Sequence, residues 1–104
     1  MSVLLELSMF PTNKEESKSE YVSQVISLIR KSGFDYQLTA MATLIETNTI
    51  EEALDLTAKC YKILEELGCN RVFSTLKMDI RKGHNNRLKG KINSIENHIG
   101  EVCK

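Results

Sequence analysis

Residues 34–46, FDYQLTAMATLIE, decide how the two halves of this chain are joined. The stretch is rich in β-branched and apolar residues, and it is long for a single strand. It therefore predicts two strands with a tight turn near Ala40–Ala42, although no Asn-Gly or Asp-Gly pair marks that turn. The rest of the fold prediction depends on this hairpin.

A strand and a helix are predicted before the hairpin. Residues 3–10, VLLELSMF, form an apolar run of strand length that Pro11 stops. A helical pattern follows, with Ser17 and Glu20 spaced as a capping box and Gly33 as the stop signal. The first half of the chain therefore reads as strand, helix, strand.

The second half repeats this order. Thr49 and Glu52 form another capping box, and Gly68 ends the helix that they begin. Residues 71–80, RVFSTLKMDI, alternate in the manner of a strand. The helix that begins after Thr49 is expected to have one apolar face. That face consists of Ala53, Thr57, Cys60, Leu64 and Leu67.

Two such halves predict one α+β domain over residues 1–104. The order strand–helix–strand–strand–helix–strand is that of the ferredoxin-like sandwich, with an antiparallel four-stranded sheet and two helices on one face. A further amphipathic helix from about Asn86 is an addition that we expect to cover a sheet edge or reach a neighbouring subunit. Its apolar stripe is Leu88, Ile92, Ile95, Ile99 and Val102.

Alternation along the outer strands predicts which side chains leave the core. The more uniformly apolar sets, such as Val3, Leu5, Leu7 and Met9, should face the helices. The opposite, open face should carry Leu4, Glu6, Ser8, Phe10, Phe73, Thr75, Lys77 and Asp79, joined by Thr39, Met41 and Thr43 from the hairpin. Its large apolar residues predict that a second subunit covers it, as a homodimer through sheet faces.

Composition narrows the function classes. Lys plus Arg equals Asp plus Glu at 14 each, so no global field favours nucleic acid or an anionic membrane. The N-terminus has no signal-peptide pattern, and the three cysteines lack zinc-site spacing, which together favour a cytoplasmic protein. No motif of a catalytic nucleophile, phosphate loop or metal centre is present, so we expect neither an enzyme nor a metal or cofactor site.

Three segments of the chain resemble the small thiamine-binding protein family, which is related to the two-domain YkoF type. They are ELSMFPT at the end of the first strand, TAMATLIET in the hairpin and RVFSTLKMDIRKG in the last strand. The most specific piece is Thr43-Leu44-Ile45-Glu46, which matches a T-x-x-E motif, with Thr47 where the family usually has Gly.

The resemblance implies a ferredoxin-like fold, pairing into homodimers and homotetramers, and binding of thiamine or its hydroxymethylpyrimidine part between subunits, without catalysis. The residues agree with what such a ligand needs: carboxylates for an amino group or a cation, hydroxyls for ring nitrogens, and apolar side chains as a wall. The candidate ligand-binding residues are Glu6, Ser8, Met9, Thr39, Met41, Thr43, Glu46, Phe73, Lys77 and Asp79.

Two alternatives stay open. The open face is also what an oligomerisation module needs, in which Lys77 pairs with Glu6 or Asp79 and no vitamin is bound. The basic residues between 81 and 91 suit a phosphate, although a solvated turn and helix face is the simpler interpretation. His84 and His98 are read as surface residues.

Overall fold

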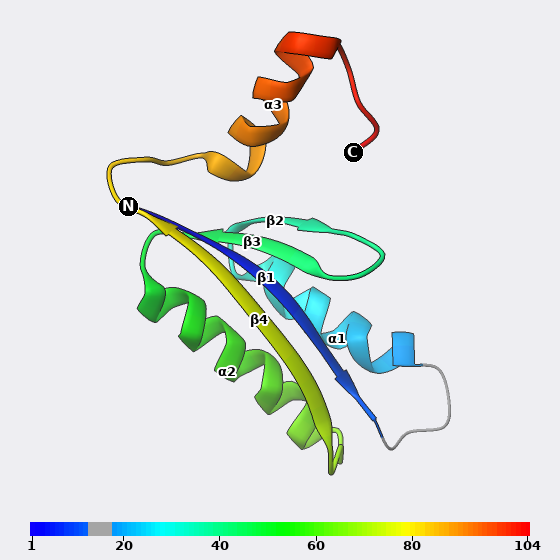
Figure 1. Cartoon of the computed structure of the whole chain (residues 1–104). Helices are drawn as coiled ribbons and strands as arrows, with labels where there is room; N and C mark the ends of the chain where they lie inside the picture. The colour runs from blue at the N-terminus through cyan, green and yellow to red at the C-terminus, as the bar shows by residue number, and fades with distance from the viewer. Residues whose placement is uncertain (13–17) are drawn as a thin grey trace.

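Seven elements follow one another in the predicted order. The computed structural model describes residues 1–12 and 18–104, and the elements are β1 (Ser2–Pro11), α1 (Lys18–Lys31), β2 (Asp35–Leu38), β3 (Thr43–Thr47), α2 (Ile50–Glu66), β4 (Val72–Arg81) and α3 (Arg87–Ile99). The four strands form one antiparallel sheet in the order β2-β3-β1-β4, and α1 and α2 cover one face of it (Figure 1). The ferredoxin-like α+β prediction is confirmed.

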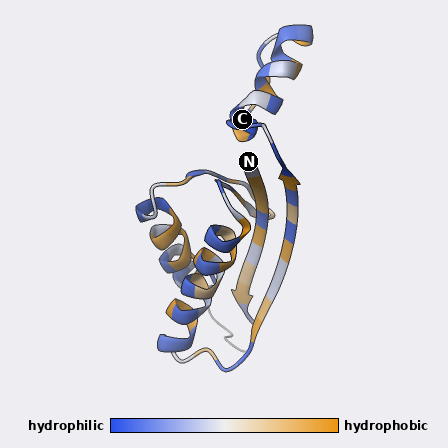
Figure 2. Ribbon diagram, turned by 90° about the vertical axis from the view of Figure 1, so that its left-hand side faces the viewer, coloured by the Kyte–Doolittle hydropathy of each residue, from blue (hydrophilic) through white to orange (hydrophobic). Residues whose placement is uncertain are grey.

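The core lies between the sheet and the two covering helices. Val3, Leu5 and Leu7 of β1 are buried there against Ile29 of α1 and Leu64 of α2. In Figure 2 the apolar sides of both helices turn toward the sheet. Alternation along β1 therefore predicted the buried set correctly.

Local signals place α2 as expected. The Thr49 hydroxyl accepts a hydrogen bond from the Glu52 amide at 3.1 Å, and the Glu52 carboxylate accepts one from the Thr49 amide at 3.0 Å. Cys60 is fully buried, and burial raises the pKa of its thiol to about 11. Leu67 is exposed and Leu56 takes its place in the core, which corrects one position of the predicted face. The Ser17 part of the other capping box lies outside the described residues.

The register confirms most of the open face and corrects its hairpin part. Glu6 lies opposite Lys77, and Phe10 lies opposite Phe73, so these side chains share the face away from α1 and α2. Thr43 instead lies opposite Leu7 on the helix side and is buried, which shows that placing it on the open face was wrong. The turn is the reason. Because β3 begins only at Thr43, its side chains alternate between the two faces of the sheet from a different starting point than the prediction assumed.

Thr39 and Met41 are also misplaced in the prediction, because neither belongs to a strand. Both lie in the turn between β2 and β3, beyond the last residue pair of these two strands, Leu38 and Thr43.

The open face is partly covered by the chain itself. The first turn of α3 lies over the end of the face where β1 begins, and Leu88 is buried there. The rest of α3 projects away from the sheet (Figures 1 and 2), and Ile99 is 73% exposed. The helix thus has an anchored first turn, and its last turns project away from the sheet.

Candidate ligand-binding site

The ten predicted site residues fall into separate places. Ser8, Met9, Thr39, Met41 and Thr43 line one pocket beside the hairpin. Glu6, Lys77 and Asp79 line a second hollow on the open face beneath α3. Phe73 and Glu46 belong to neither.

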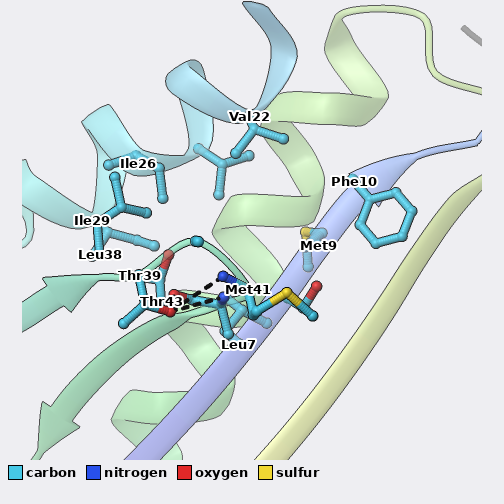
Figure 3. A pocket seen from close by; sticks show the side chains of 14 residues that line it. Leu7, Met9, Phe10, Val22, Ile26, Ile29, Leu38, Thr39, Met41 and Thr43 are labelled. Atoms are coloured by element: carbon cyan, nitrogen blue, oxygen red, sulfur yellow. Dashed lines mark hydrogen bonds between the residues drawn. The ribbon is translucent and has the colours of Figure 1, made fainter. Parts of the chain in front are cut away.

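The first hollow, here called the hairpin pocket, has a volume of about 190 Å³ and lies between α1, the hairpin turn and β1 (Figure 3). Val22, Ile26 and Ile29 line it from α1, and Met41 and Thr43 line it from the hairpin. It is an apolar cavity with a few polar groups, which is the usual character of a small-molecule site.

The pocket exists because β3 is shorter than β1. The pairing between them ends at Leu7 and Thr43, whereas β1 continues to Pro11 with only β4 beside it. Consecutive residues 7–10 all line the pocket, although their side chains alternate between the two faces of the sheet. The pocket therefore runs along an edge of β1 that no described strand occupies, and the backbone N–H and C=O groups of that edge are open to a ligand.

Two hydroxyls of the pocket are available and one is not. Thr39 Oγ1 donates to the Ala42 carbonyl at 2.7 Å and accepts from the Ala42 amide at 3.1 Å, so it closes the turn (Figure 3). The hydroxyls of Ser8 and Thr43 make no hydrogen bond within residues 1–12 and 18–104. Polar side chains at a pocket wall without protein partners are candidates for contact with a ligand.

The second hollow is wider, at about 330 Å³, and its charges are unequally engaged. Asp79 Oδ2 forms ion pairs with Arg87 Nη1 at 3.0 Å and with Lys91 Nζ at 3.2 Å. A hydrogen bond from Lys91, with the nearby Arg87 guanidinium, lowers the pKa of Asp79 despite some desolvation. Glu6 and Lys77 form no ion pair with any described residue.

Glu46 has a structural role that its motif did not reveal. Its carboxylate accepts hydrogen bonds from the backbone amides of Arg87 and Leu88, each at 3.0 Å, and from the Ser2 hydroxyl. Asn86 precedes the helix in a left-handed conformation and offers no side-chain cap, so Glu46 caps α3 from β3 instead.

Burial alone would raise the pKa of Glu46, but the hydrogen bonds from Ser2 and from the two amides outweigh it, and the pKa lies below its ordinary value of 4.5. Thr47, where the family usually has Gly, continues the strand with its hydroxyl bonded to the Thr49 carbonyl at 2.8 Å. The carboxylate is thus held in place without a glycine after it.

Arg87 is the residue of this region that the sequence interpretation missed. It was counted among solvated basic residues, yet its guanidinium is buried and donates to the Ser2 carbonyl at 2.8 Å and to the Asp79 carbonyl at 2.6 Å. Its partners lie 85 and 8 positions away along the chain, and no local spacing reveals such contacts. The two histidines are exposed, as expected.

Phe10 and Phe73 form an aromatic pair between β1 and β4. Their ring centroids lie 5.8 Å apart with the planes tilted by 32°, and Lys18 Nζ lies 4.9 Å from the Phe10 centroid. Phe10 also borders the hairpin pocket, while Phe73 is 53% exposed. The pair forms an apolar rim on the open face next to the pocket.

The described part of the chain contains neither a cluster of metal ligands nor a helix that could span a membrane. It holds no group of three or more His, Cys, Asp or Glu side chains that could bind a metal ion. Nor does it contain a helix with the length and apolar character that crossing a membrane requires.

The fold and the pocket define the class: a ferredoxin-like α+β domain with a small, mainly apolar cavity. The family model described as "Thiamine-binding protein" matches residues 5–96, and the chain belongs to this family.

Relatives of similar length support the assignment. A UPF0045 protein of Methanothermobacter thermautotrophicus is 26% identical over 93% of this chain and 99% of its own length. The UPF0045 protein MJ1052 of Methanocaldococcus jannaschii is 32% identical over 89% of this chain and 91% of its own.

Solved structures show the same fold. The crystal structure of MJ1052 superposes with a TM-score of 0.77 at 30% identity, covering 90% of this chain and 95% of that one. A Thermotoga maritima protein described as a "putative thiamine biosynthesis/salvage protein" gives a TM-score of 0.79 at 20% identity, covering 91% and 99%.

Proposed function

We propose that this protein binds thiamine or its hydroxymethylpyrimidine part without changing it chemically, and that the aminopyrimidine ring occupies the hairpin pocket. The observation that carries the proposal is the family match over residues 5–96 in a chain whose hairpin pocket retains unpartnered hydroxyls. The thiamine biosynthesis or salvage role given to the Thermotoga maritima neighbour points the same way.

The pocket suits one ring better than the whole vitamin. At about 190 Å³ it lies below the roughly 300–1,000 Å³ typical of sites for drug-sized ligands. Met9 and Met41 provide polarisable walls, and the Ser8 and Thr43 hydroxyls with the open edge of β1 provide donors and acceptors for ring nitrogens and the amino group. The remainder of thiamine would therefore lie outside.

Glu6 is positioned to offset the cationic thiazolium. It lies two residues from Ser8 on the same face of β1, about 7 Å along the strand, and has no ion-pair partner among the described residues. A carboxylate at this distance from the ring favours thiamine over the neutral pyrimidine. Asp79 and Glu46 serve this role less well, since both carboxylates are already engaged.

Binding without catalysis fits the lining of the pocket. None of its residues carries a titratable group, so no side chain there acts as a general acid, base or thiolate nucleophile.

We further propose a cytoplasmic homo-oligomer in which a second subunit covers the open face and its exposed Phe73.

Calorimetry with thiamine and with hydroxymethylpyrimidine tests the proposal. Thr43→Val keeps the shape of the side chain and removes one hydroxyl, so both ligands should bind about tenfold more weakly. The matched control is Thr57→Val, whose hydroxyl bonds within α2, away from the pocket, and which should leave affinity unchanged. Glu6→Gln should weaken the binding of thiamine and leave the binding of hydroxymethylpyrimidine unchanged.

The outcomes separate the two functions. If neither ligand gives detectable heat at high protein concentration, the chain is an oligomerisation module and the binding proposal is wrong. If both bind and Thr43→Val changes nothing, the site lies elsewhere.

A further inference from the structure

Beyond Leu7, β1 has a free edge on the side of β3, and the hydrogen-bond pattern of the sheet determines which main-chain groups point there. In an antiparallel ladder the N–H and C=O of one residue point to the same side, and successive residues alternate between the two sides. The Thr12 amide donates to the Arg71 carbonyl at 3.0 Å, directly after the pair of Pro11 and Val72. Even-numbered residues of β1 therefore bond to β4, and odd-numbered residues face β3.

The hairpin confirms this alternation independently. The Thr39 amide donates to the Ala42 carbonyl at 2.9 Å across the turn, so the next residue, Thr43, directs its main chain to β1. Thr43 lies opposite Leu7, and the ladder between β1 and β3 ends with this pair. The next odd-numbered residue of β1 is Met9, and no strand of the described chain lies beside it on that side.

Met9 therefore presents one donor and one acceptor at the hairpin pocket, which it lines. No residue among 1–12 and 18–104 forms a hydrogen bond with its N–H or C=O on this side. An unpaired main-chain group away from water is costly. A ligand that satisfies both groups in this mainly apolar pocket removes that cost, whereas a ligand that satisfies neither adds to it.

Pro11 keeps the same edge from binding another strand. It is the odd-numbered residue after Met9 and has no N–H, so the free edge offers no second donor there. Proline on a strand edge blocks strand addition. Val22 and Ile26 of α1 and Met41 of the turn line the space beside this edge. A single donor next to a single acceptor thus borders a cavity of about 190 Å³, which has room for one ring.

We infer that the main chain of Met9 determines the class of ligand that the hairpin pocket binds: planar heterocycles with an amino group next to an acceptor ring nitrogen. The Met9 C=O accepts from the amino group, and the Met9 N–H donates to the ring nitrogen. The aminopyrimidine of thiamine has this edge, so the inference rests on the proposed function and assigns its selectivity to two main-chain groups. A 4-oxo ring has the opposite pattern, because its ring nitrogen bears a proton and its exocyclic oxygen only accepts. It therefore places donor against donor and acceptor against acceptor.

Calorimetry with thiamine and with its 4-oxo analogue tests the inference. The analogue keeps the thiazolium and differs only at the edge of the pyrimidine ring. The wild type should bind thiamine at least about 100-fold more tightly than the analogue. If the two bind equally, the inference is wrong and the binding function stands. If neither binds, the proposed function fails and the inference fails with it.

Two variants separate the main chain of Met9 from its side chain. Met9→Pro removes the N–H at an edge where no bond of the ladder needs it, so the preference for thiamine over the analogue should fall about tenfold or more. Met9→Val keeps the N–H and has a side chain close in size to proline, so the preference should remain. An unchanged preference in a folded Met9→Pro chain overturns the inference.

Amide hydrogen exchange of the wild type gives a second test that requires no variant. In the free chain the Met9 amide should exchange much faster than the Leu7 amide, which faces Thr43 in the ladder. Saturating thiamine should slow exchange at Met9 by about tenfold or more. A Met9 amide that is as protected as Leu7 without ligand, or that bound thiamine does not protect, contradicts the inference.

Discussion

At the scale of single residues, Glu46 and Arg87 belong to one ionic cluster that holds the start of β1 and the start of α3 together. Glu46 caps α3 from the neighbouring strand, and Arg87 joins the start of β1 to the end of β4. The motif around Glu46 was recognisable in the sequence. Its partners were not, because they lie 41 to 44 positions away and depend on how the sheet is assembled.

Glu46→Gln should destabilise the protein in a pH-dependent way. The pKa of Glu46 lies below its ordinary 4.5, so the carboxylate contributes stability above that value and loses it as pH falls through the folded-state pKa. At about pH 7 the substitution should lower the free energy of unfolding by about 1–3 kcal/mol, and the difference should shrink below about pH 4.

Urea unfolding across this pH range measures the effect. Glu66→Gln, at an exposed position of α2, is the matched control and should change stability little at any pH. A Glu46→Gln deficit that is the same at both ends of the pH range would show that the charge of the carboxylate is not what holds α3.

At the scale of elements, repeated local signals made the hairpin, the two covering helices and β1 predictable. The capping box of α2 and the alternation of β1 each specify an element without help from distant residues. The position of Thr43 was missed because the turn carries no Gly or Asn, so alternation could not be counted from a fixed point. The same uncertainty hid the hairpin pocket, which depends on where β3 begins relative to β1.

The apolar stripe of α3 was predictable, but which of its residues are buried was not. Leu88 is buried under the anchored first turn, whereas Ile95 and Ile99 are exposed. Leu88→Ala should therefore cost about 2 kcal/mol or more, and Ile99→Ala should cost less than about 0.5 kcal/mol. Urea unfolding of dilute protein compares the two. Equal losses would mean that the whole helix is packed in solution.

At the scale of the whole molecule, two surfaces expose large apolar side chains. The open face bears the aromatic pair, and the β4 edge bears Leu76 and Ile80, which are 37% and 46% exposed. Alternation along the strands predicted the open face, whereas the exposure of the β4 edge became visible only with the strand order β2-β3-β1-β4. The family and the fold were predicted from the sequence. The proposal that the ring and the carboxylate occupy separate places came only from the pockets of the structure.

The location of the ligand is the central claim, and amide NMR of the uniformly ¹⁵N-labelled chain during a thiamine titration tests it most directly. We predict saturable shifts concentrated in the hairpin turn, in residues 7–10 of β1 and in the facing turns of α1, with a smaller effect at Glu6. Saturable shifts confined to the hollow under α3, or no shifts at all, would contradict the account.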